Sequence, residues 1–516
     1  MTAYLDLIMF GALMVAILSG FPVSFSIVGI GIAFAYIGWV LGVMDVSLLG
    51  AMGQRVFGLI SNQVLIAIPL FVLMGALLEK SRIAEELLDT MGRLFGQLRG
   101  GLGISVVLVG ALLAASTGIV GATVVAMGMI ALPTMLRAGY DPRVASGIVC
   151  TAGTLGQIIP PSTLLIILAD VMSNAFQQAQ YEQGKFSVEA LSVGQFFAAA
   201  LVPGLLLVCL YLIYILVRGF LRPGDMPPAA LDMPKPDRAE VIRAIVPPIL
   251  LIFAVLGAIL GGIATPTEAA SVGAVGALLM AGLRLGVNHR QILLGIAALV
   301  VLGILAGVFP VRLQRNDLSM TSYVAGAFYV VLAITGTFAI VLALRSALRQ
   351  KVIQEAVNST LTMTSMIFAT ILAAGIFSLV FIGLGGEERV AHLLQSMPGG
   401  ATGALVFSML FIFVLGFFLD FVEISVILLP LVTPPLIMMG HDPIWLGILI
   451  AINLQTSFLT PPFGFSLFYL RGAAPKEVTT AHIYAGVVPF IGLQAIGVIL
   501  IWIFPALATW LPSAIF

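Results

Sequence analysis

The chain has 516 residues, of which 60% are hydrophobic and only 9% are charged. About a quarter of the residues of a typical soluble domain are charged, so this composition excludes a soluble globular protein and predicts a polytopic membrane protein. The formal net charge is zero, which gives no basic surface for nucleic acid. The two cysteines, Cys150 and Cys209, have neither metal nor redox spacing and are expected to be buried small hydrophobic residues.

The chain begins with an apolar segment that has no basic start and no small-residue cleavage site, so we interpret it as a first span and not as a signal peptide. A membrane span needs about 20 apolar residues. The segments that meet this requirement are residues 4–19, 23–43, 62–79, 144–170, 195–217, 244–263, 267–284, 291–310, 322–344, 358–384, 443–470 and 483–510.

Two further apolar stretches, 102–136 and 401–438, are too long for one span and too short for two spans with a turn. Each has small or polar residues near its middle, which favours a re-entrant helical hairpin whose tip is covered by protein or water. Between the early spans, residues 80–100 place apolar side chains on one helical face among charges. This pattern predicts an interfacial amphipathic helix.

Three other segments carry local signals. Residues 221–240 are rich in proline and charge, which indicates a solvated linker. Residues 290–344 add two spans that begin and end at basic clusters, as an inserted helical pair would. The sequence from Thr265 to Glu268 reads Thr-Pro-Thr-Glu and predicts a capping box at a helix start.

Residues 139–161 and 440–462 form an internal repeat. Asp141, Pro142 and the Pro160-Pro161 pair each recur 301 residues later, as Asp442, Pro443 and Pro461-Pro462, and Pro133 recurs as Pro434. Proline donates no backbone hydrogen bond, so each Pro-Pro pair is expected to break a membrane helix near its middle. Interrupted helices at matching places in two halves of a chain point to the binding site of a secondary transporter.

The basic residues favour one orientation of these spans. If both hairpins return to their side of origin and the amino terminus is outside, the inner loops hold 18 Lys and Arg residues and the outer loops hold 5. This agrees with the positive-inside rule. The same path puts the first hairpin at the inner face and the second at the outer face, so the two repeats are inverted.

A broken helix exposes carbonyl groups on one side of the break and amides on the other. The carbonyls suit Na⁺, and the amino-terminal end of a half-helix suits a carboxylate. The alternative is a pair of buried structural kinks. The predicted substrate ligands at the breaks are Thr154, Ser162, Asn453, Gln455, Thr460 and Pro461, and the predicted sodium ligands are Gly153, Gly156, Pro160, Thr456 and Ser457.

The hairpins contribute further candidates. The first tip, with Ser116, Thr117, Gly118, Gly121 and Thr123, is expected to lie beside the first break, although small-residue helix packing would also explain it. In the second hairpin, Asp420 and Glu423 are acids within an apolar stretch. They either attract a cation or line an aqueous path, or they lie in an exposed loop between the hairpin arms.

Five segments give the chain a family resemblance: AIPLFVLMGALLE at 67–79, GATVVAMGMIALPTMLRAGYDP at 121–142, GTLGQIIPPS at 153–162, GIATPTEAA at 262–270 and NLQTSFLTPPFG at 453–464. With them the chain resembles the large membrane subunit of tripartite ATP-independent periplasmic (TRAP) transporters. Two features differ from the family pattern. Ile119 stands where the family's first hairpin tip has a serine, and the 290–344 pair is missing from shorter members.

The resemblance implies an all-α, inverted-repeat, elevator-type importer in a bacterial inner membrane, with sodium as the coupling ion and no cofactor. It implies that Ser116, Thr117 and Gly118 help to bind sodium and that Thr123 faces the substrate. The implied partners are a small four-helix membrane subunit, a periplasmic substrate-binding protein, a small organic anion and membrane lipid. The expected regions are scaffold 1–100, transport repeat 101–170, scaffold 171–289, inserted pair 290–344, scaffold 345–400, transport repeat 401–475 and a final span 476–516.

Two other functions stay open at this point. One is a stand-alone sodium/organic anion symporter that needs no binding protein, and the other is an ion channel with re-entrant pore hairpins. The sequence shows no serine–histidine constellation, P-loop or GxGxxG motif, so we do not expect an enzyme or an ATP-driven pump.

Overall fold

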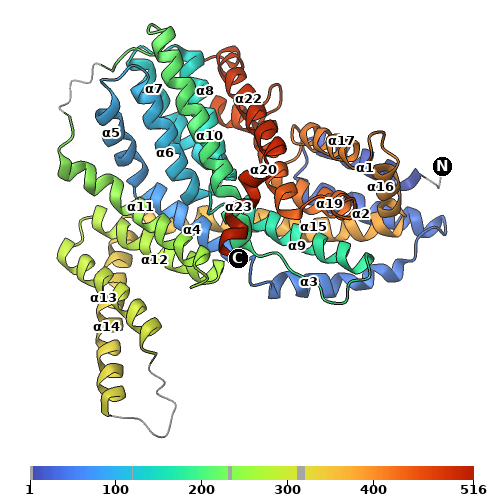
Figure 1. Ribbon diagram of the computed structural model, residues 1–516, viewed down its shortest axis with the longest axis horizontal. Helices are drawn as coiled ribbons and strands as arrows, with labels where there is room; N and C mark the ends of the chain where they lie inside the picture. The colour runs from blue at the N-terminus through green and yellow to red at the C-terminus, as the bar shows by residue number, and fades with distance from the viewer. Residues whose placement is uncertain (1–3, 119, 230–234, 311–319) are drawn as a thin grey trace.

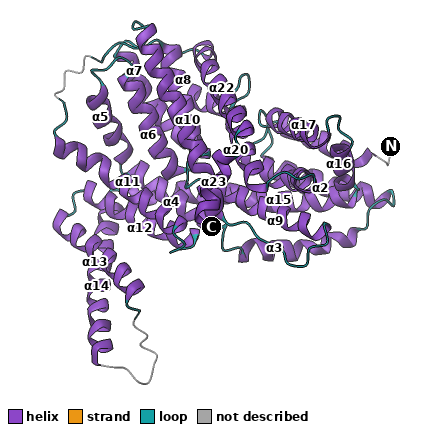
Figure 2. Ribbon diagram, in the orientation of Figure 1, coloured by secondary structure: helices purple, strands orange, loops and turns teal. Residues whose placement is uncertain are grey.

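The computed structural model describes residues 4–118, 120–229, 235–310 and 320–516, without the side chains of residues 114–117. All regular secondary structure in these residues is helical (Figures 1 and 2). Ten of the described helices are long and apolar enough to cross a membrane. The polytopic class that the composition predicts, and the all-α fold that the resemblance implies, are therefore confirmed.

The helices follow one another in this order. The first part of the chain contains α1 (Leu5–Leu18), α2 (Val23–Val40), η2 (Val46–Ala51), α3 (Met52–Ser61), α4 (Ala67–Lys80), α5 (Ile83–Phe95), α6 (Gly101–Thr117), α7 (Val120–Arg137), α8 (Pro142–Thr154), η3 (Leu155–Gln157), α9 (Thr163–Glu182) and α10 (Val193–Leu221). The second part contains α11 (Arg238–Leu260), α12 (Pro266–Arg284), α13 (His289–Val308), α14 (Met320–Arg349), α15 (Val352–Gly383), α16 (Gly386–Gln395), α17 (Gly400–Leu415), α18 (Phe421–Glu423), η4 (Ile424–Leu428), α19 (Leu429–Met438), α20 (Pro443–Leu459), α21 (Phe465–Ala473), α22 (Thr480–Ile503) and α23 (Ala506–Ile515).

Both Pro-Pro segments interrupt a helix, as predicted. The first break separates η3 from α9 at residues 158–162, and the second separates α20 from α21 at residues 460–464. Both Pro-Pro peptide bonds are cis. Asp141 and Asp442 start the two broken helices in the same way, because each carboxylate accepts a backbone N–H in the first turn while proline occupies the first helical position.

Each broken helix follows a helical hairpin. Hairpin 1 is α6 with α7, and hairpin 2 is α17 with the α18–η4–α19 arm. The second arms begin at Val120 and Phe421 and end at Arg137 and Met438, so the 301-residue offset also holds for their helix boundaries. The repeat therefore includes the hairpins as well as the breaks.

The two repeats pack against each other reciprocally. The distal half of the first broken helix, α9, packs on α19 of hairpin 2. The distal half of the second, α21, packs on α7 of hairpin 1. Two copies related by an approximate two-fold axis make this exchange of contacts, and the inverted-repeat fold is accordingly seen in the packing as well as in the sequence.

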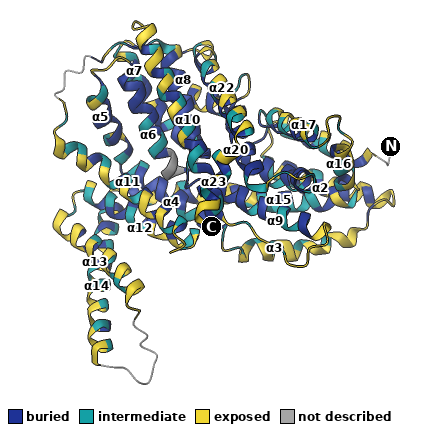
Figure 3. Cartoon of the chain, viewed as in Figure 1, coloured by how far each residue is buried: buried dark blue, intermediate teal, exposed yellow. Residues whose placement is uncertain are grey.

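The remaining helices surround the repeats. The long helix α15 packs on α2 and α4, and α4 packs on α12. The pair α13–α14 projects from the body at the lower left of Figure 1 and is mostly exposed in Figure 3. Its helices meet through small residues, since a Cβ on Gly295 would lie 2.1 Å from Cβ of Ala339.

The segment at 80–100 folds as the amphipathic helix α5, as predicted, and its apolar face packs on α6 and α11; its place at the membrane interface stays a prediction. The Ser105 hydroxyl donates to the carbonyl of Met91 at 2.8 Å and fixes this contact. The capping box predicted at Thr265 and Glu268 is confirmed at the start of α12.

Some boundaries differ from the sequence prediction. The helix α9 continues to Glu182, beyond the expected end at 170. Its last turns are polar, so hydropathy does not predict them as part of a span, but they pack on neighbouring helices and stay helical. The last expected span divides at Pro505 into α22 and α23. The short helices α3 and α16 were not anticipated. Cys150 is buried as predicted, but Cys209 on α10 is exposed, so that part of the prediction is wrong.

Candidate functional site

The first break is buried and held by its own polar groups. Ser162 and Thr163 are both 0% exposed. The Ser162 hydroxyl donates to the carbonyl of Gln157 at 2.8 Å, across the non-helical residues. Pro160 and Gly156 lie buried in the same segment. The break is therefore a fixed, folded loop between two helix ends.

The tip of hairpin 1 lies against this break, as the sequence predicts. The Thr163 hydroxyl donates to the carbonyl of Gly118 at 2.6 Å. Gly118 has φ +61°, and a Cβ there would lie 3.0 Å from the backbone nitrogen of Thr163. Only glycine suits both the left-handed backbone and this close approach. The side chains of Ser116 and Thr117, and all of Ile119, lie outside the described residues.

Two more predicted residues lie in the core, one on the second arm of hairpin 1 and one facing that arm. Thr123 on α7 is 2% exposed. Gly153 on α8 faces α7 so closely that a Cβ would lie 2.3 Å from Cγ2 of Val124. Tyr469 on α21 covers Gly121 from the other repeat, with its ring 3.0 Å from where a Cβ would be. Hairpin 1 is thus packed between both broken helices.

The second break presents hydroxyl groups whose protons are already used within α20. Thr456, Ser457 and Thr460 donate to the carbonyls of Ile452, Leu454 and Thr456 at 2.8, 2.8 and 2.7 Å. Because each hydroxyl donates its proton to a carbonyl of its own helix, its oxygen lone pairs remain available as acceptors. Such oxygens can face a cation. Pro461 lies in the break that follows.

Hairpin 2 is anchored to α20 beside these hydroxyls. The Asn453 amide donates to the carbonyl of Met409 on α17 at 2.7 Å. At the end of α17, Gly416 approaches Ser457 so closely that a Cβ would lie 2.1 Å from its Oγ. The contact of a hairpin with its own broken helix is thereby present in both repeats.

Asp420 and Glu423 form a capping box at the tip of hairpin 2. Oδ1 of Asp420 accepts the N–H of Phe421 at 2.8 Å, and Oε2 of Glu423 accepts the N–H of Asp420 at 2.7 Å. Glu423 is 7% exposed, so the expectation of an exposed loop is wrong for this residue. Both acids satisfy the freed amides of a helix start. The cation-attracting role stays a prediction.

The two broken helices touch at a pair of equivalent residues. The Gln455 amide donates to the Thr154 hydroxyl at 3.3 Å, and these residues are 301 positions apart, which is the repeat offset. A residue that touches its own repeat partner must lie close to the axis that relates the copies. Thr154 and Gln455, both predicted as ligands, therefore mark the approximate two-fold axis.

Next to this axis are buried polar atoms without a hydrogen-bond partner among the described residues. They are Oε1 of Gln455, both amide atoms of Gln157 and the hydroxyl of Thr151. All three side chains are 0% exposed. Unpaired polar groups in a native core are rare and indicate an ion or water. The sequence reasoning missed Gln157 and Thr151; an amide three residues before Pro-Pro in an apolar stretch is the signal that identifies Gln157.

Comparisons with known proteins agree with this fold. The family model described as Tripartite ATP-independent periplasmic transporter, DctM component, matches residues 10–293 and 284–507. The C4-dicarboxylate TRAP transporter large permease protein DctM of Vibrio cholerae is 28% identical over 97% of both chains. The protein of the same name from Pseudomonas aeruginosa is 28% identical over 89% of this chain and 88% of its own length.

A solved structure supports the fold independently. The YdaH transporter of Alcanivorax borkumensis, described as having an unusual topology, has a TM-score of 0.52. It covers 95% of this chain and 98% of its own, at 14% identity, so the likeness concerns the fold alone. With the family model matching nearly the whole length, this chain belongs to the large permease subunits of the tripartite ATP-independent periplasmic transporters, which are multi-pass proteins of the inner membrane.

Proposed function

We propose that this permease couples inward sodium flux to the uptake of a small organic acid anion. C4-dicarboxylates are the first class to test, because the relatives from Vibrio cholerae and Pseudomonas aeruginosa carry that name. We further propose that it works with a small four-helix membrane subunit and a periplasmic substrate-binding protein. The observation that carries the proposal is the group of unpaired oxygens where the two broken helices meet.

Sodium is a hard cation and prefers oxygen ligands. In the proposed site, Oε1 of Gln455 and of Gln157, together with the Thr151 hydroxyl, supply neutral oxygens in the buried core. The backbone around Gly153, Gly156 and Pro160, the tip of hairpin 1 and the hydroxyls of Thr456 and Ser457 supply others. A cation held there would pair the otherwise unpaired oxygens, which makes its binding favourable.

The substrate carboxylate is proposed to meet the amino-terminal ends of α9 and α21, which begin directly after the breaks. The first amides of each half-helix have no partner inside the helix and point toward the break. Ser162 and Thr460 flank these ends, and Thr123 and Asn453 come from the neighbouring arms. In the proposed elevator motion, both hairpins and both broken helices move together against the helices around them.

The test is uptake by proteoliposomes that contain the permease and its small membrane subunit. Radiolabelled succinate is supplied with the purified binding protein, with and without an inward sodium gradient. Saturable uptake that requires both the gradient and the binding protein supports the proposal. Full uptake without the binding protein would identify a stand-alone symporter, and steady currents far above transporter turnover would identify a channel. Uptake that is indifferent to sodium would refute the coupling.

A further inference from the structure

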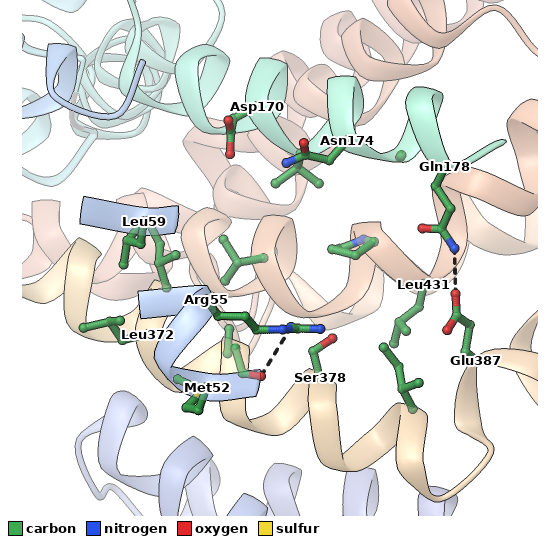
Figure 4. Close-up of a pocket in the computed structure, with 18 residues that line it drawn as sticks. Met52, Arg55, Leu59, Asp170, Asn174, Gln178, Leu372, Ser378, Glu387 and Leu431 are labelled. Carbon is green, nitrogen blue, oxygen red and sulfur yellow. Dashed lines mark hydrogen bonds between the residues drawn. The ribbon is translucent and has the colours of Figure 1, made fainter. Parts of the chain in front are cut away.

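A cavity of about 450 Å³ lies apart from the breaks, between α3, α9, α15 and the η4–α19 arm of hairpin 2. Ligand sites in proteins have volumes of about 300–1,000 Å³. Figure 4 shows the side chains that line it. The first residue of α9 that lines it is Asp170, about two helical turns beyond Ser162. It is therefore a separate site from the one between the breaks.

Arg55 extends from α3 into the middle of this cavity (Figure 4). Its Nη1 donates to the carbonyl of Gly375 on α15 at 3.4 Å, a long and weak hydrogen bond. No ion pair of Arg55 is found in the described part of the chain. A guanidinium always carries its charge and has five N–H donors in one plane, a geometry that matches a carboxylate. Most of the donor capacity of Arg55 is thus available to a ligand.

Neutral polar groups from other helices also line the cavity. Asn174 and Gln178 lie on α9, and Ser378 lies on α15 close to the guanidinium (Figure 4). The amide of Asn174 and the hydroxyl of Ser378 can each donate to an anion. Leu59, Leu372 and Leu431 give the walls an apolar character. A small carboxylate with a short hydrocarbon body fits this combination of donors and walls.

The two acids at the cavity, Asp170 and Glu387, each accept a hydrogen bond from a neighbouring side-chain amide. Oδ1 of Asp170 accepts from the Asn62 amide at 2.9 Å, and Oε1 of Glu387 accepts from the Gln178 amide at 2.8 Å. Figure 4 places the Arg55 guanidinium between them. The amide bonds do not neutralise these carboxylates, and Glu387 also acts electrostatically on Arg55, so an anion is attracted only where it contacts the guanidinium in the middle of the cavity.

We propose that this cavity is a receiving site for carboxylate anions, held by Arg55 before they reach the breaks. The positive-inside count places α3 and α16 on the outer side, where a binding protein delivers its ligand. The identification of the anion as the transported organic acid rests on the proposed function. The preference of Arg55 for anions does not.

The first experiment measures that preference without transport. In the full-length protein, Cys150→Ala and Cys209→Ser remove the native thiols. Asn174→Cys is then introduced as a reporter. Its reaction rates with an anionic and a cationic methanethiosulfonate of similar size are compared. We expect Arg55→Gln to lower the anion-to-cation rate ratio about tenfold. Gln54→Ala, beside Arg55 but not lining the cavity, should leave the ratio unchanged. An anion-to-cation rate ratio that is the same with Arg55 and with Arg55→Gln overturns the proposal.

The second experiment measures succinate uptake in proteoliposomes with the binding protein. Arg55→Gln should raise the half-saturating concentration of succinate about tenfold and change the maximal rate less than twofold, because a receiving site raises the local anion concentration. Arg55→Lys keeps the charge, so its half-saturating concentration of succinate should fall between those of the wild type and Arg55→Gln. If wild-type uptake is sodium-driven and neither measurement responds to Arg55→Gln, the receiving site is refuted and the function stands. If no succinate is carried but the rate ratio responds, the site stands and the proposed substrate is refuted.

Discussion

Gln157 has a buried side-chain amide whose hydrogen-bonding capacity is not used by the described residues packed around it. It has no hydrogen-bond partner among the described residues and is 0% exposed, beside a break in the helix. Leaving a buried amide unpaired costs about 1–3 kcal/mol. A ligand that pairs with it recovers this energy, and we therefore place Gln157 among the proposed sodium ligands.

Gln157→Leu tests this role with a side chain of similar size. We expect at least a tenfold increase in the sodium concentration for half-maximal succinate uptake, because one oxygen ligand is lost, and no loss of thermal stability, because an unpaired polar group is removed. Gln494→Leu is the matched control. Gln494 is also 0% exposed with an unpaired Oε1, but its amide bonds to Tyr211, away from the breaks. Equal sodium dependence in both variants would contradict the assignment.

Thr163 joins hairpin 1 to the first break, and Thr163→Val removes the hydroxyl without changing the shape. The lost bond to Gly118 should cost about 1 kcal/mol of stability and free the hairpin tip, so uptake should fall more than fivefold. Thr360→Val is the comparison. Within the described part of the chain that buried hydroxyl bonds only to Ala356 in its own helix, so uptake should change little. The measurement is initial uptake rate at equal amounts of folded protein; similar rates in both variants would argue against a role for the tie.

Among the elements, glycine contacts set how closely the helices approach. The helices α8 and α22 cross where Gly147 faces Gly486, and a Cβ on Gly147 would lie 2.1 Å from the Gly486 carbonyl oxygen. Backbone atoms cannot rotate away as a side chain can. This crossing fixes the position of the first broken helix on the C-terminal span.

Gly147→Ala should therefore separate α8 from α22 and lower the free energy of unfolding by about 1–3 kcal/mol. Gly492→Ala is the control on α22, since no atom of the described residues lies within 4 Å of its added Cβ. It should be neutral or slightly stabilising, by up to about 1 kcal/mol, because alanine favours helix over glycine. Thermal unfolding of the purified proteins in detergent measures both. A Gly147→Ala protein as stable as the control would show that this contact is loose.

For the molecule as a whole, the elevator proposal requires α9 to move relative to the surrounding helices. The side chains of Asn62, next to α3, and Asp170, on α9, join these parts by a 2.9 Å hydrogen bond. A covalent link at the same place would stop the motion without entering either break.

Asn62→Cys with Asp170→Cys, in a chain without its native cysteines, should lose most sodium-driven uptake after treatment with a short bis-methanethiosulfonate, which joins the two thiols through disulfide bonds and releases sulfinate. A reducing agent cleaves those disulfides and should restore uptake. Ser173→Cys with Gln177→Cys is the control, because that 3.2 Å contact lies within α9 and links no separate parts. Uptake that continues at full rate in the linked Asn62–Asp170 pair would rule out the motion.

The membrane class, the repeat and the two breaks can all be predicted from the amino-acid sequence. These depend on composition, on an offset and on the missing N–H of proline, all of which are local properties. Thr154 and Gln455 can also be selected from the sequence as candidate ligands, because polar residues beside a break are conspicuous in apolar sequence. The contact of these two residues at the axis, the capping of a helix by Asp420 and Glu423, and the position of Arg55 at a cavity could not be predicted and are seen only in the folded chain. Those facts depend on which helices pack together, and one helix's pattern does not specify its neighbours.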